Sequence, residues 1–482
     1  MGAGPSGLLL ALLLAQHSIP TLVLEAWPRL DTRLRATQYG VPATRVFRRA
    51  GLLPDIRAGS IRSFPSISWR RADDHRQLVR LDMACVADHD DRMTIMPLGD
   101  LVKIMFAHCL RHPGVVEVRF EHRAVGVGQD GEGAWVDVDV TERSVEGQEE
   151  EERVRRERFR ADFVVGCDGA TSAVRKALFG REWPGQTFQQ QIVVQNVWYD
   201  GFDKHGWAGG NYIVDRDVWG LIAQRGKGGL WRVTYGDIGG LSDDEYLQRR
   251  PTRLEKMLPG HPKPDEYRIG DTNIYKMHNR CVDTMRVGRI LLAADAAHVC
   301  NPWGGYGCMT AILDAGGLAD CFIGMYKGLA GDDILDRYAE VRRDRFLRYV
   351  DARSIKNLDR ISKVTDPSTV VETDKFFGIL KRLEGDAEAT KAFLLVRLAQ
   401  GPKTDCRAVP GEPSADETRR KLRASSTTLR STTRPAATET SRELRHWDEL
   451  WKGGNQMRMA RYGPTSIVAR GIRTVTTSPR TQ

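Results

Sequence analysis

The chain has 482 residues, of which 41 % are apolar and 28 % charged, so it is long enough for two or three structural units. This composition excludes a disordered, collagen-like or coiled-coil body. The net charge of +9 is concentrated after residue 401, where 16 basic and 8 acidic residues give a net charge of +8. The preceding 401 residues hold 56 basic and 55 acidic residues, a net charge of +1. A nearly neutral body argues against nucleic acid as a partner.

The C-terminal segment, residues 402–482, is rich in Ser, Thr and Arg and shows no apolar periodicity. We expect a largely disordered, solvated tail, with anion binding as the less favoured alternative. The eight cysteines show neither a CxxC pair nor metal-ligand spacing, which favours reduced thiols, a cytoplasmic location and no metal site. No transmembrane segment is expected, because no apolar run approaches the ~20 residues that a span needs.

The first motif lies at the start of the chain, where Gly2, Gly4 and Gly7 fit the pattern GxGxxG. The apolar stretch behind them predicts a buried helix, and residues 21–24 predict a short strand that ends at Glu25. This order is a dinucleotide-binding fingerprint, in which the glycines let the backbone approach a diphosphate and the acid binds ribose hydroxyls. An acid at this position favours an unphosphorylated ribose, as in FAD or NAD.

The fingerprint normally follows a strand, but Met1 stands directly before the first glycine. The strand that fills the middle of such a sheet is therefore missing from the sequence. We expect the true start of the protein to lie upstream, and the mass of the native N-terminus would test this.

A second GxGxxG match spans residues 126–131 and shows how little the pattern means alone. It is followed by residues 134–140, in which apolar and polar side chains alternate as in a half-buried strand. We therefore assign the second match to a hairpin turn. No separate nicotinamide-binding Rossmann unit is visible, so NAD(P)H has to bind without one.

Two later motifs each combine an apolar strand with a turn that contains an acid. Residues 163–166 lead into an Asp-Gly turn at Asp168, and a helix follows. Residues 289–294 lead into Asp295, a glycine-rich loop over residues 301–307 and a helix of small residues. Such turns are often plain connections, but three motifs in this order are hard to obtain by chance.

With these motifs the chain resembles the FAD-dependent aromatic hydroxylases of the para-hydroxybenzoate hydroxylase type, which are group A flavoprotein monooxygenases. The resemblance covers roughly residues 1–365 and is strongest to the fungal secondary-metabolism branch. It implies that FAD is the cofactor and NAD(P)H the co-substrate. It also implies ten cofactor-binding residues: Gly2, Gly4, Gly7, Glu25, Arg35, Asp168, Asp295, Gly304, Gly305 and Gly307.

Each of these residues matches one part of the family's cofactor site. By the resemblance, the first glycine loop and Glu25 hold the ADP half of FAD, and Arg35 contacts the flavin nucleotide. Asp168 belongs to the motif that serves both FAD and the transient NAD(P)H. Asp295 belongs to the motif whose acid binds the ribityl chain, and the glycines after it line the isoalloxazine.

The sequence departs from the family pattern at two places. Ala294 stands where the family usually has glycine, a small change that a buried strand end can accept. The helix near residues 98–112, which in relatives offers a Gln or Arg to FAD, is entered through Met, Pro and Leu instead. We therefore carry no residue over from that helix.

The resemblance implies an α/β fold in which a Rossmann-type FAD-binding domain is interleaved with an antiparallel-sheet substrate domain. Strand-like runs at residues 191–198, 218–223 and 230–235 agree with such a sheet, and residues 333–363 have the spacing of a long amphipathic helix. The expected bounds are 1–65, 95–186 and 279–365 for the FAD-binding domain, 66–94 and 187–278 for the substrate domain, 366–401 for a helical extension and 402–482 for the disordered tail.

The resemblance implies a single-component monooxygenase whose chemistry is supplied by the cofactor. NAD(P)H would reduce FAD, O₂ would add at flavin C4a, and the resulting hydroperoxide would hydroxylate or epoxidise an aromatic or polyketide-like small molecule in secondary metabolism. An ionisable side chain that activates a phenol would assist. The middle segment offers four candidates, for each of which ordinary packing is the more frequent role: His205, Tyr212, Tyr275 and His278.

Other functions compete with this interpretation. A flavin-dependent halogenase is disfavoured, because its Trp-x-Trp-x-Ile-Pro signature does not occur. A flavin-dependent reductase of an isoprenoid-type substrate stays open, since its pocket leaves no short motif. So does a truncated, non-catalytic product that is unable to hold FAD. The substrate, the oligomeric state and the choice between NADH and NADPH are not assigned.

Overall fold

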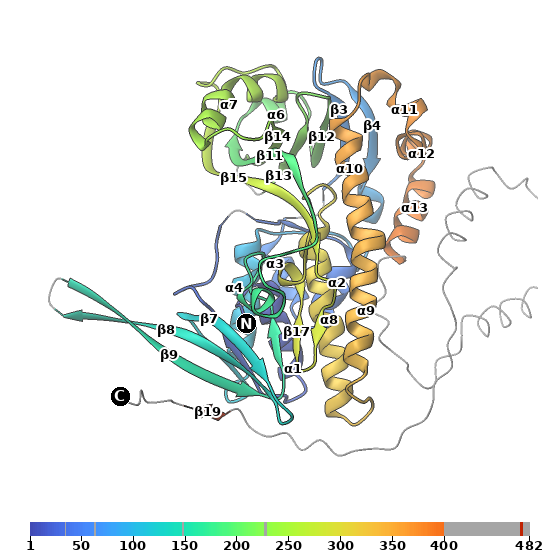
Figure 1. Cartoon of the computed structure of the whole chain (residues 1–482). Coiled ribbons are helices and arrows are strands. Elements are labelled where there is room, and N and C mark those ends of the chain that lie inside the picture. Colours follow the sequence, from blue (N-terminus) through green and yellow to red (C-terminus); the bar gives the residue numbers. More distant parts are fainter. Residues whose placement is uncertain (34, 62–63, 147–148, 226–228, 400–472, 476–482) are drawn as a thin grey trace, which may run out of the picture. The chain divides into compact units, whose positions relative to one another are not determined.

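The computed structural model describes residues 1–399 and 473–475, apart from 34, 62–63, 147–148 and 226–228. These residues belong to one unit of the chain, which comprises residues 1–406 and 468–482. The tail expected over residues 402–482 thus lies outside the described residues, except for the three that form β19 (Arg473–Val475). Figure 1 labels the helices and strands in chain order.

The helix and strand of the dinucleotide fingerprint are confirmed. α1 (Pro5–Ala15) follows the glycine loop directly, and β1 (Thr21–Leu24) pairs in parallel with β6 (Val116–Arg119). A second small sheet contains β10 (Val164–Gly166) and β17 (Ile290–Leu292), which are also parallel. The chain thus holds the parallel strands expected of a nucleotide-binding domain, in two separate groups.

Met1 and Gly2 lie between these two groups of strands. The Met1 amino group donates to the Val165 carbonyl at 2.7 Å, and the Cys167 N–H donates to the Met1 carbonyl at 2.8 Å. On the other side, the Gly2 N–H donates to the Leu24 carbonyl at 2.8 Å. Two residues therefore make the bonds of a strand that would join β1 to β10. The upstream start stays a prediction.

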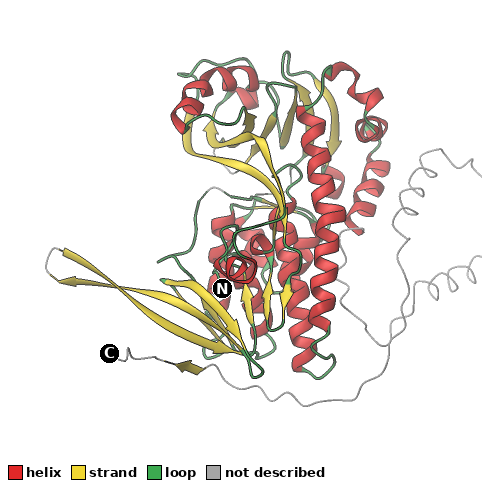
Figure 2. Cartoon of the chain, in the orientation of Figure 1, coloured by secondary structure: helices red, strands yellow, loops and turns green. Residues whose placement is uncertain are grey.

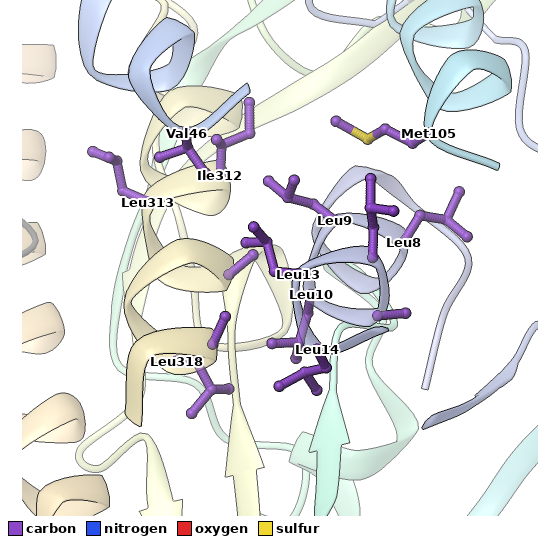
Figure 3. Packing of buried hydrophobic residues seen from close by; sticks show 14 of the residues in the cluster. Leu8, Leu9, Leu10, Leu13, Leu14, Val46, Met105, Ile312, Leu313 and Leu318 are labelled. Atoms are coloured by element: carbon purple, nitrogen blue, oxygen red, sulfur yellow. The ribbon is translucent and has the colours of Figure 1, made fainter. Parts of the chain in front are cut away.

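α1 is buried on all sides, because every residue from Ser6 to Ala15 is shielded from solvent. A helix that is apolar around its whole circumference belongs in a core. It packs against α4 (Leu98–Cys109) and α8 (Tyr306–Tyr326). Figure 3 shows the leucines of α1 pointing toward Met105 of α4 and toward Ile312 and Leu318 of α8.

α8 is the one helix of the described chain that is long and apolar enough to cross a membrane. Of its most apolar stretch, 67 % is buried inside the fold. Its contacts with α1 identify it as a core helix.

A mixed sheet of eight strands forms the second half of the fold. Its order is β18-β15-β11-β14-β13-β12-β3-β4, and all neighbours are antiparallel except β12 and β3. In this order the strands are β18 (His298–Val299), β15 (Arg268–Cys281), β11 (Gly185–Trp198), β14 (Leu230–Asp237), β13 (Gly220–Gln224), β12 (Gly210–Val214), β3 (Ser66–Arg71) and β4 (Gln77–Asp82).

The two faces of this sheet have different neighbours. Trp231, Val233 and Tyr235 of β14 enter a cluster with Met257 of α7 (Asp243–Met257). Because side chains alternate along a strand, Arg232 points to the opposite face. That face borders the site described below. Figure 2 shows the helices that cover the sheet in red.

The second GxGxxG match is confirmed as part of a hairpin. β7 (His122–Gln129) pairs with β8 (Ala134–Glu146), and Asp130 in the turn between them accepts the N–H groups of Glu132 and Gly133. β9 (Glu149–Ala161), in which acidic and basic residues predominate, pairs with β8 and continues the sheet.

The long helix expected over residues 333–363 is present in three consecutive segments. They are α9 (Ile334–Arg345), a π-helical turn (Phe346–Asp351) and α10 (Ala352–Ser362). The apolar residues of α9 join the core of α1, whereas Leu358 and Ile361 of α10 join the core on the Arg232 face of the eight-stranded sheet. This helix therefore contacts both halves of the fold.

Shorter elements connect these parts. The residues expected to form a helical extension, 366–401, contain α11 (Val370–Thr373), α12 (Lys375–Leu383) and α13 (Ala387–Ala399). The others are β2 (Gln38–Tyr39), α2 (Val41–Arg49), α3 (Leu53–Gly59), β5 (Thr94–Ile95), α5 (Ala173–Phe179), α6 (Gly201–Lys204), β16 (Arg286–Val287) and 3-10 turns at Ala84–Val86, Ala294–Ala296 and Pro367–Thr369.

Candidate functional site

The three glycines of the first loop differ in what surrounds them. Gly2 has a φ of +94°, and a Cβ there would lie 2.5 Å from the Cys167 carbonyl oxygen. A Cβ on Gly7 would lie 2.0 Å from the Gly2 carbonyl oxygen. A Cβ on Gly4 would meet nothing within 4 Å. Gly2 and Gly7 therefore allow close backbone packing, whereas Gly4 borders open space at the start of α1.

The start of α1 is suited to a bound anion. Gly4 is its N-cap, no side chain caps it, and its first turn holds no acid. Backbone N–H groups at such a helix end attract diphosphate groups. Open space beside Gly4 and uncapped N–H groups together fit the diphosphate of a dinucleotide, as the sequence predicts.

Glu25 is fixed beside the same loop. One carboxylate oxygen accepts the Ala3 N–H at 2.7 Å, and the other accepts the Trp27 N–H at 2.9 Å. The first bond ties the acid after β1 to the glycine loop. This placement fits the predicted contact with ribose hydroxyls.

The Asp168 side chain forms hydrogen bonds within its own turn. Its carboxylate accepts the Ser172 hydroxyl at 2.5 Å and the Ala173 N–H at 2.7 Å, so it caps α5. Arg175 then joins this turn to the next motif, because it donates to the Ala170 carbonyl at 2.8 Å and to the Ala296 carbonyl at 3.2 Å. Contact between Asp168 and FAD or NAD(P)H stays a prediction.

Asp295 lies in the turn after β17 and accepts no hydrogen bond within the part of the chain that the structure describes. Burial raises the pKa of its carboxyl group, while the charges of His298 and Arg35 lower it. A shielded acid without a protein donor fits a ligand that brings hydroxyl groups, such as a ribityl chain.

Ala294, which replaces the family's glycine, has a φ of +59°. This is the left-handed region, in which glycine is unstrained and alanine is not. The replacement of glycine by Ala294 therefore introduces local backbone strain next to Asp295.

A buried charged cluster, which the sequence did not reveal, supports this turn from behind. Asp314 of α8 accepts Arg342 Nε at 2.6 Å and the Ala294 N–H at 2.9 Å, and His298 Nε2 lies 2.9 Å from it. Burial alone would raise the pKa of Asp314, but Arg342 and His298 lower it to about 2. We call Asp314, His298 and Arg342 the Asp314 cluster.

The glycine-rich loop before α8 needs glycine at two positions. Gly304 has a φ of +120° and Gly305 a φ of +67°. A Cβ on Gly304 would also lie 2.4 Å from the Tyr306 ring, whereas nothing lies within 4 Å of one on Gly305. The Sγ of Cys300 lies 3.9 Å from a Cβ on Gly307. The loop thus exposes backbone to open space, as expected of a flat ring's binding surface.

Arg35 borders a cavity of about 210 Å³. This cavity also touches Arg232 of the eight-stranded sheet, whose Nη1 donates to the Arg35 carbonyl at 2.6 Å. The predicted flavin contact thus lies next to the predicted substrate domain. The residues that line the cavity are Thr32, Arg33, Arg35, Thr37, Pro97, Leu98, Gly99, Asp100, Lys103 and Arg232.

A second buried polar group, which sequence reasoning also missed, lies on the face of the sheet that carries Arg232. The Nε and Nη1 atoms of Arg225 are buried without a hydrogen-bond partner among the described residues. Burial and the charge of Arg232 lower the pKa of Arg225 to about 9. The Tyr39 hydroxyl is likewise buried without a partner, and Tyr212 also interacts with Arg225. We call Arg225, Arg232, Tyr39 and Tyr212 the Arg225 cluster.

Strand register decides which of the four predicted activating residues share this face. Tyr212 opposes Leu221, two residues before Ala223, which opposes Arg232. Tyr275 opposes Ile192, which lies on the same face as the partner of Arg232. The register therefore brings Tyr212 and Tyr275 to the face of the Arg225 cluster.

The two histidine candidates lie elsewhere. His205 directly follows α6, is exposed, and has its ring beside Gly260. His278 bonds the Thr187 hydroxyl at 2.9 Å and, three residues after Tyr275, points to the other face of β15. Burial and the charges of Arg280 and Lys276 lower its pKa.

Comparison with known proteins agrees with this geometry. A family model described as FAD binding domain matches residues 1–353. The chain is 35 % identical over 397 residues to the para-nitrophenol 4-monooxygenase of Pseudomonas sp. (strain WBC-3), which covers 82 % of this chain and 93 % of the relative. It is 32 % identical over 365 residues to the 6-hydroxy-3-succinoylpyridine 3-monooxygenase of Pseudomonas putida (strain DSM 28022 / S16), with 74 % and 87 % covered.

Solved structures show the same fold. The crystal structure of p-nitrophenol 4-monooxygenase from Pseudomonas putida DLL-E4 is similar with a TM-score of 0.72 and 31 % identity, over 82 % of this chain and 95 % of that one. A complex of aklavinone-11 hydroxylase with FAD and aklavinone has a TM-score of 0.63 at 23 % identity, over 75 % and 68 %. The predicted interleaving of an α/β nucleotide-binding domain with a sheet domain is thus confirmed at the level of the fold.

Proposed function

Because the chain belongs to the FAD-dependent group A flavoprotein monooxygenases, we propose that it transfers one oxygen atom from O₂ to a hydroxyarene that carries a second, oxygen-rich substituent. Bound FAD would supply the redox chemistry, with two electrons drawn from NAD(P)H. The ring gains one hydroxyl group, and the other oxygen atom leaves as water.

The observation that carries this proposal is the buried guanidinium of Arg225, whose Nε and Nη1 atoms have no hydrogen-bond partner among the residues that the structure describes. Burying a charge without a partner is unfavourable, so a fold that keeps one beside its predicted active site is suited to a ligand that completes the pair. A guanidinium presents a planar fork of donors, which matches the two oxygens of a carboxylate or nitro group. The Tyr39 hydroxyl offers one further polar contact.

The names of three relatives point to the same substrate class. They act on para-nitrophenol, on 6-hydroxy-3-succinoylpyridine and on 3-(3-hydroxy-phenyl)propionate or 3-hydroxycinnamic acid. Each of these is a hydroxylated aromatic ring with a second substituent that contains oxygen. Hydroxylation of such a ring is therefore favoured over epoxidation and over a polyketide substrate.

The chain's own residues would hold the cofactor at its two ends. The uncapped start of α1 beside Gly4 would bind the diphosphate, and Glu25 would bind the ribose next to it. Asp295 would accept hydrogen bonds from the ribityl chain, and Arg35 would lie between this group and the cavity.

Tyr212 and Tyr275 are the best placed of the four candidates to contact the substrate hydroxyl. Burial raises the pKa of Tyr212 to about 12, with Arg225 opposing the shift, and burial also raises that of Tyr275. Both phenols are therefore protonated near neutral pH and can donate or accept a hydrogen bond. His205 and His278 are not proposed for this role.

Purified protein would test the proposal directly. We expect a yellow protein with flavin absorbance, in which a carboxylate- or nitro-substituted phenol stimulates NAD(P)H oxidation and ¹⁸O from ¹⁸O₂ appears in the product. The matched control is phenol itself, which lacks the second substituent and should stimulate weakly. Stimulation without ¹⁸O in the product would contradict a monooxygenase.

The same experiment addresses the alternatives. A reduced product without oxygen incorporation would support a flavin-dependent reductase, and a colourless protein would support a non-catalytic product. The fungal branch, secondary metabolism, the cytoplasmic location and the choice between NADH and NADPH stay predictions. Parallel assays with NADH and NADPH would decide the last of these.

A further inference from the structure

Four aromatic rings form a column that ends at Tyr212. β3 and β12 are parallel neighbours in which Trp69 and Tyr212 are direct partners. Their rings are stacked with centroids 5.4 Å apart and planes inclined by 10°. The centroids of Phe376 and Phe377 lie 5.4 and 5.9 Å from that of Trp69, and both rings meet it edge-on. A continuous aromatic path thus runs from α12 to the face of the Arg225 cluster.

The far end of the column is held firmly. Asp374 caps α12 by accepting the Phe376 N–H at 2.7 Å, and it also accepts Arg360 Nε from α10 at 2.9 Å. The Arg360 guanidinium carbon lies 4.5 Å from the centroid of Phe376. Trp69 is 7 % exposed and Phe377 is fully buried. Because its neighbours are locked, Trp69 has little freedom to rotate.

Tyr212 is held by its ring and not by its hydroxyl. Its hydroxyl accepts and donates no hydrogen bond among the residues that the structure describes. Besides burial, two charged or ionisable groups act on its pKa, Tyr306 at the start of α8, which raises it, and Arg225 after β13, which lowers it. Stacking on Trp69 is therefore the contact that sets where the hydroxyl points.

We propose that Trp69, backed by Phe376 and Phe377, is a positioning residue that aims the Tyr212 hydroxyl at the hydroxyl of the substrate. The C-terminal helix α12 is then a rear wall of the active site, although it lies outside the residues 1–353 that the family model matches. This inference rests on the proposed function, because it needs a hydroxylated substrate at this face.

The substitution Trp69→Leu tests the inference, and the decisive measurement is coupling, the fraction of oxidised NAD(P)H that appears as hydroxylated product. A ring held about 1 Å out of place reacts far more slowly, so we expect coupling to fall about tenfold while the FAD content stays that of the native protein. Trp69→Phe keeps a ring that stacks and should restore coupling to within about twofold.

Two controls separate positioning from general damage to the sheet. Trp231 is 1 % exposed and stacks on Phe202 on the opposite face, so Trp231→Leu removes a similar buried ring. Its coupling should stay near that of the native protein. Phe376→Leu acts at the far end of the column and should lower coupling about twofold, which tests the inference even where Trp69→Leu does not fold.

A double-mutant cycle gives the sharpest outcome. If Trp69 acts through Tyr212, then Trp69→Leu adds nothing to the loss of coupling caused by Tyr212→Phe. Losses that multiply, or unchanged coupling in Trp69→Leu or in Phe376→Leu, would overturn the inference while the native activity upholds the proposed function. A native protein that hydroxylates no phenol would overturn both.

Discussion

Two clusters of buried charge lie near the predicted flavin, and they differ in whether the protein itself neutralises them. In the Asp314 cluster a carboxylate is in contact with Arg342, with His298 and with a backbone N–H. In the Arg225 cluster two guanidinium nitrogens have no partner among the described residues. From this difference we infer that the first cluster stabilises the fold, and our proposal assigns the open positions of the second to a ligand.

The largest effect is expected from breaking the paired cluster. Arg342→Met leaves the buried Asp314 without its strongest partner, so we expect the free energy of unfolding to fall by about 3–5 kcal/mol. Urea denaturation would measure it. As a control, Arg337 lies on the same helix and its side chain is 63 % exposed, so Arg337→Met should change stability by less than about 0.5 kcal/mol. Equal losses in both variants would remove the contrast.

The opposite pattern is expected in the incomplete cluster. Arg225→Met removes a buried charge that has no partner among the described residues, so the free energy of unfolding should stay the same or rise. The KM for a carboxylate-substituted phenol should rise about 100-fold, because a charge-assisted pair is lost. Arg225→Lys keeps the charge without the planar fork and should lie in between. A less stable Arg225→Met protein with native KM would make Arg225 a structural residue.

The paired cluster should also appear in the pH dependence of stability. The pKa of Asp314 is about 2 in the folded protein, below the 3.8 of an unperturbed aspartate. Its stabilising contribution is therefore complete above pH ~4 and is lost as the pH falls toward 2, by about 2 kcal/mol. Urea denaturation between pH 5 and 2 would measure this loss. Asp314→Asn should be less stable at pH 7 and lose less on acidification, and an unchanged slope would contradict the assignment.

The smallest effect concerns the strained turn that links the Asp314 cluster to Asp295. Ala294→Gly relieves a φ of +59°, so we expect stability to rise by up to about 1 kcal/mol in spite of glycine's greater chain entropy. Ala297 has a φ of −93° in the same segment, and Ala297→Gly should lower stability by about 0.5–1 kcal/mol. Thermal unfolding would compare them, and a loss in both would show that Ala294 is not strained.

The two clusters also mark how far sequence reasoning reaches. The glycine loop and Glu25 are predictable because the glycines, the helix and the acid follow one another within one short motif of the chain. The Arg225 cluster draws residues from β2, β12, β14 and the residue after β13, and only sheet register shows that three of them share a face. Of its members, only Tyr212 was a candidate, and it was one of four.

Two local features were visible in the sequence but not used. Ser242 and Glu245 form a capping box at the start of α7, and this pair was not used to predict the helix. Ser172 is the N-cap of α5, and the Asp168 carboxylate accepts the Ser172 hydroxyl and the Ala173 N–H at the same helix end.

The π-helical turn Phe346–Asp351 has a mechanical consequence. Each residue of an α-helix advances the side chains by about 100°, so the wider turn shifts the phase of α10 relative to α9. One continuous helix can thereby present Leu335 to the nucleotide-binding core and Leu358 to the core on the Arg232 face of the eight-stranded sheet. A single helix then sets the spacing between the nucleotide-binding core and the substrate sheet. An insertion or deletion in the π-helical turn would change the orientation of α10 relative to α9 and so disturb the packing of both cores.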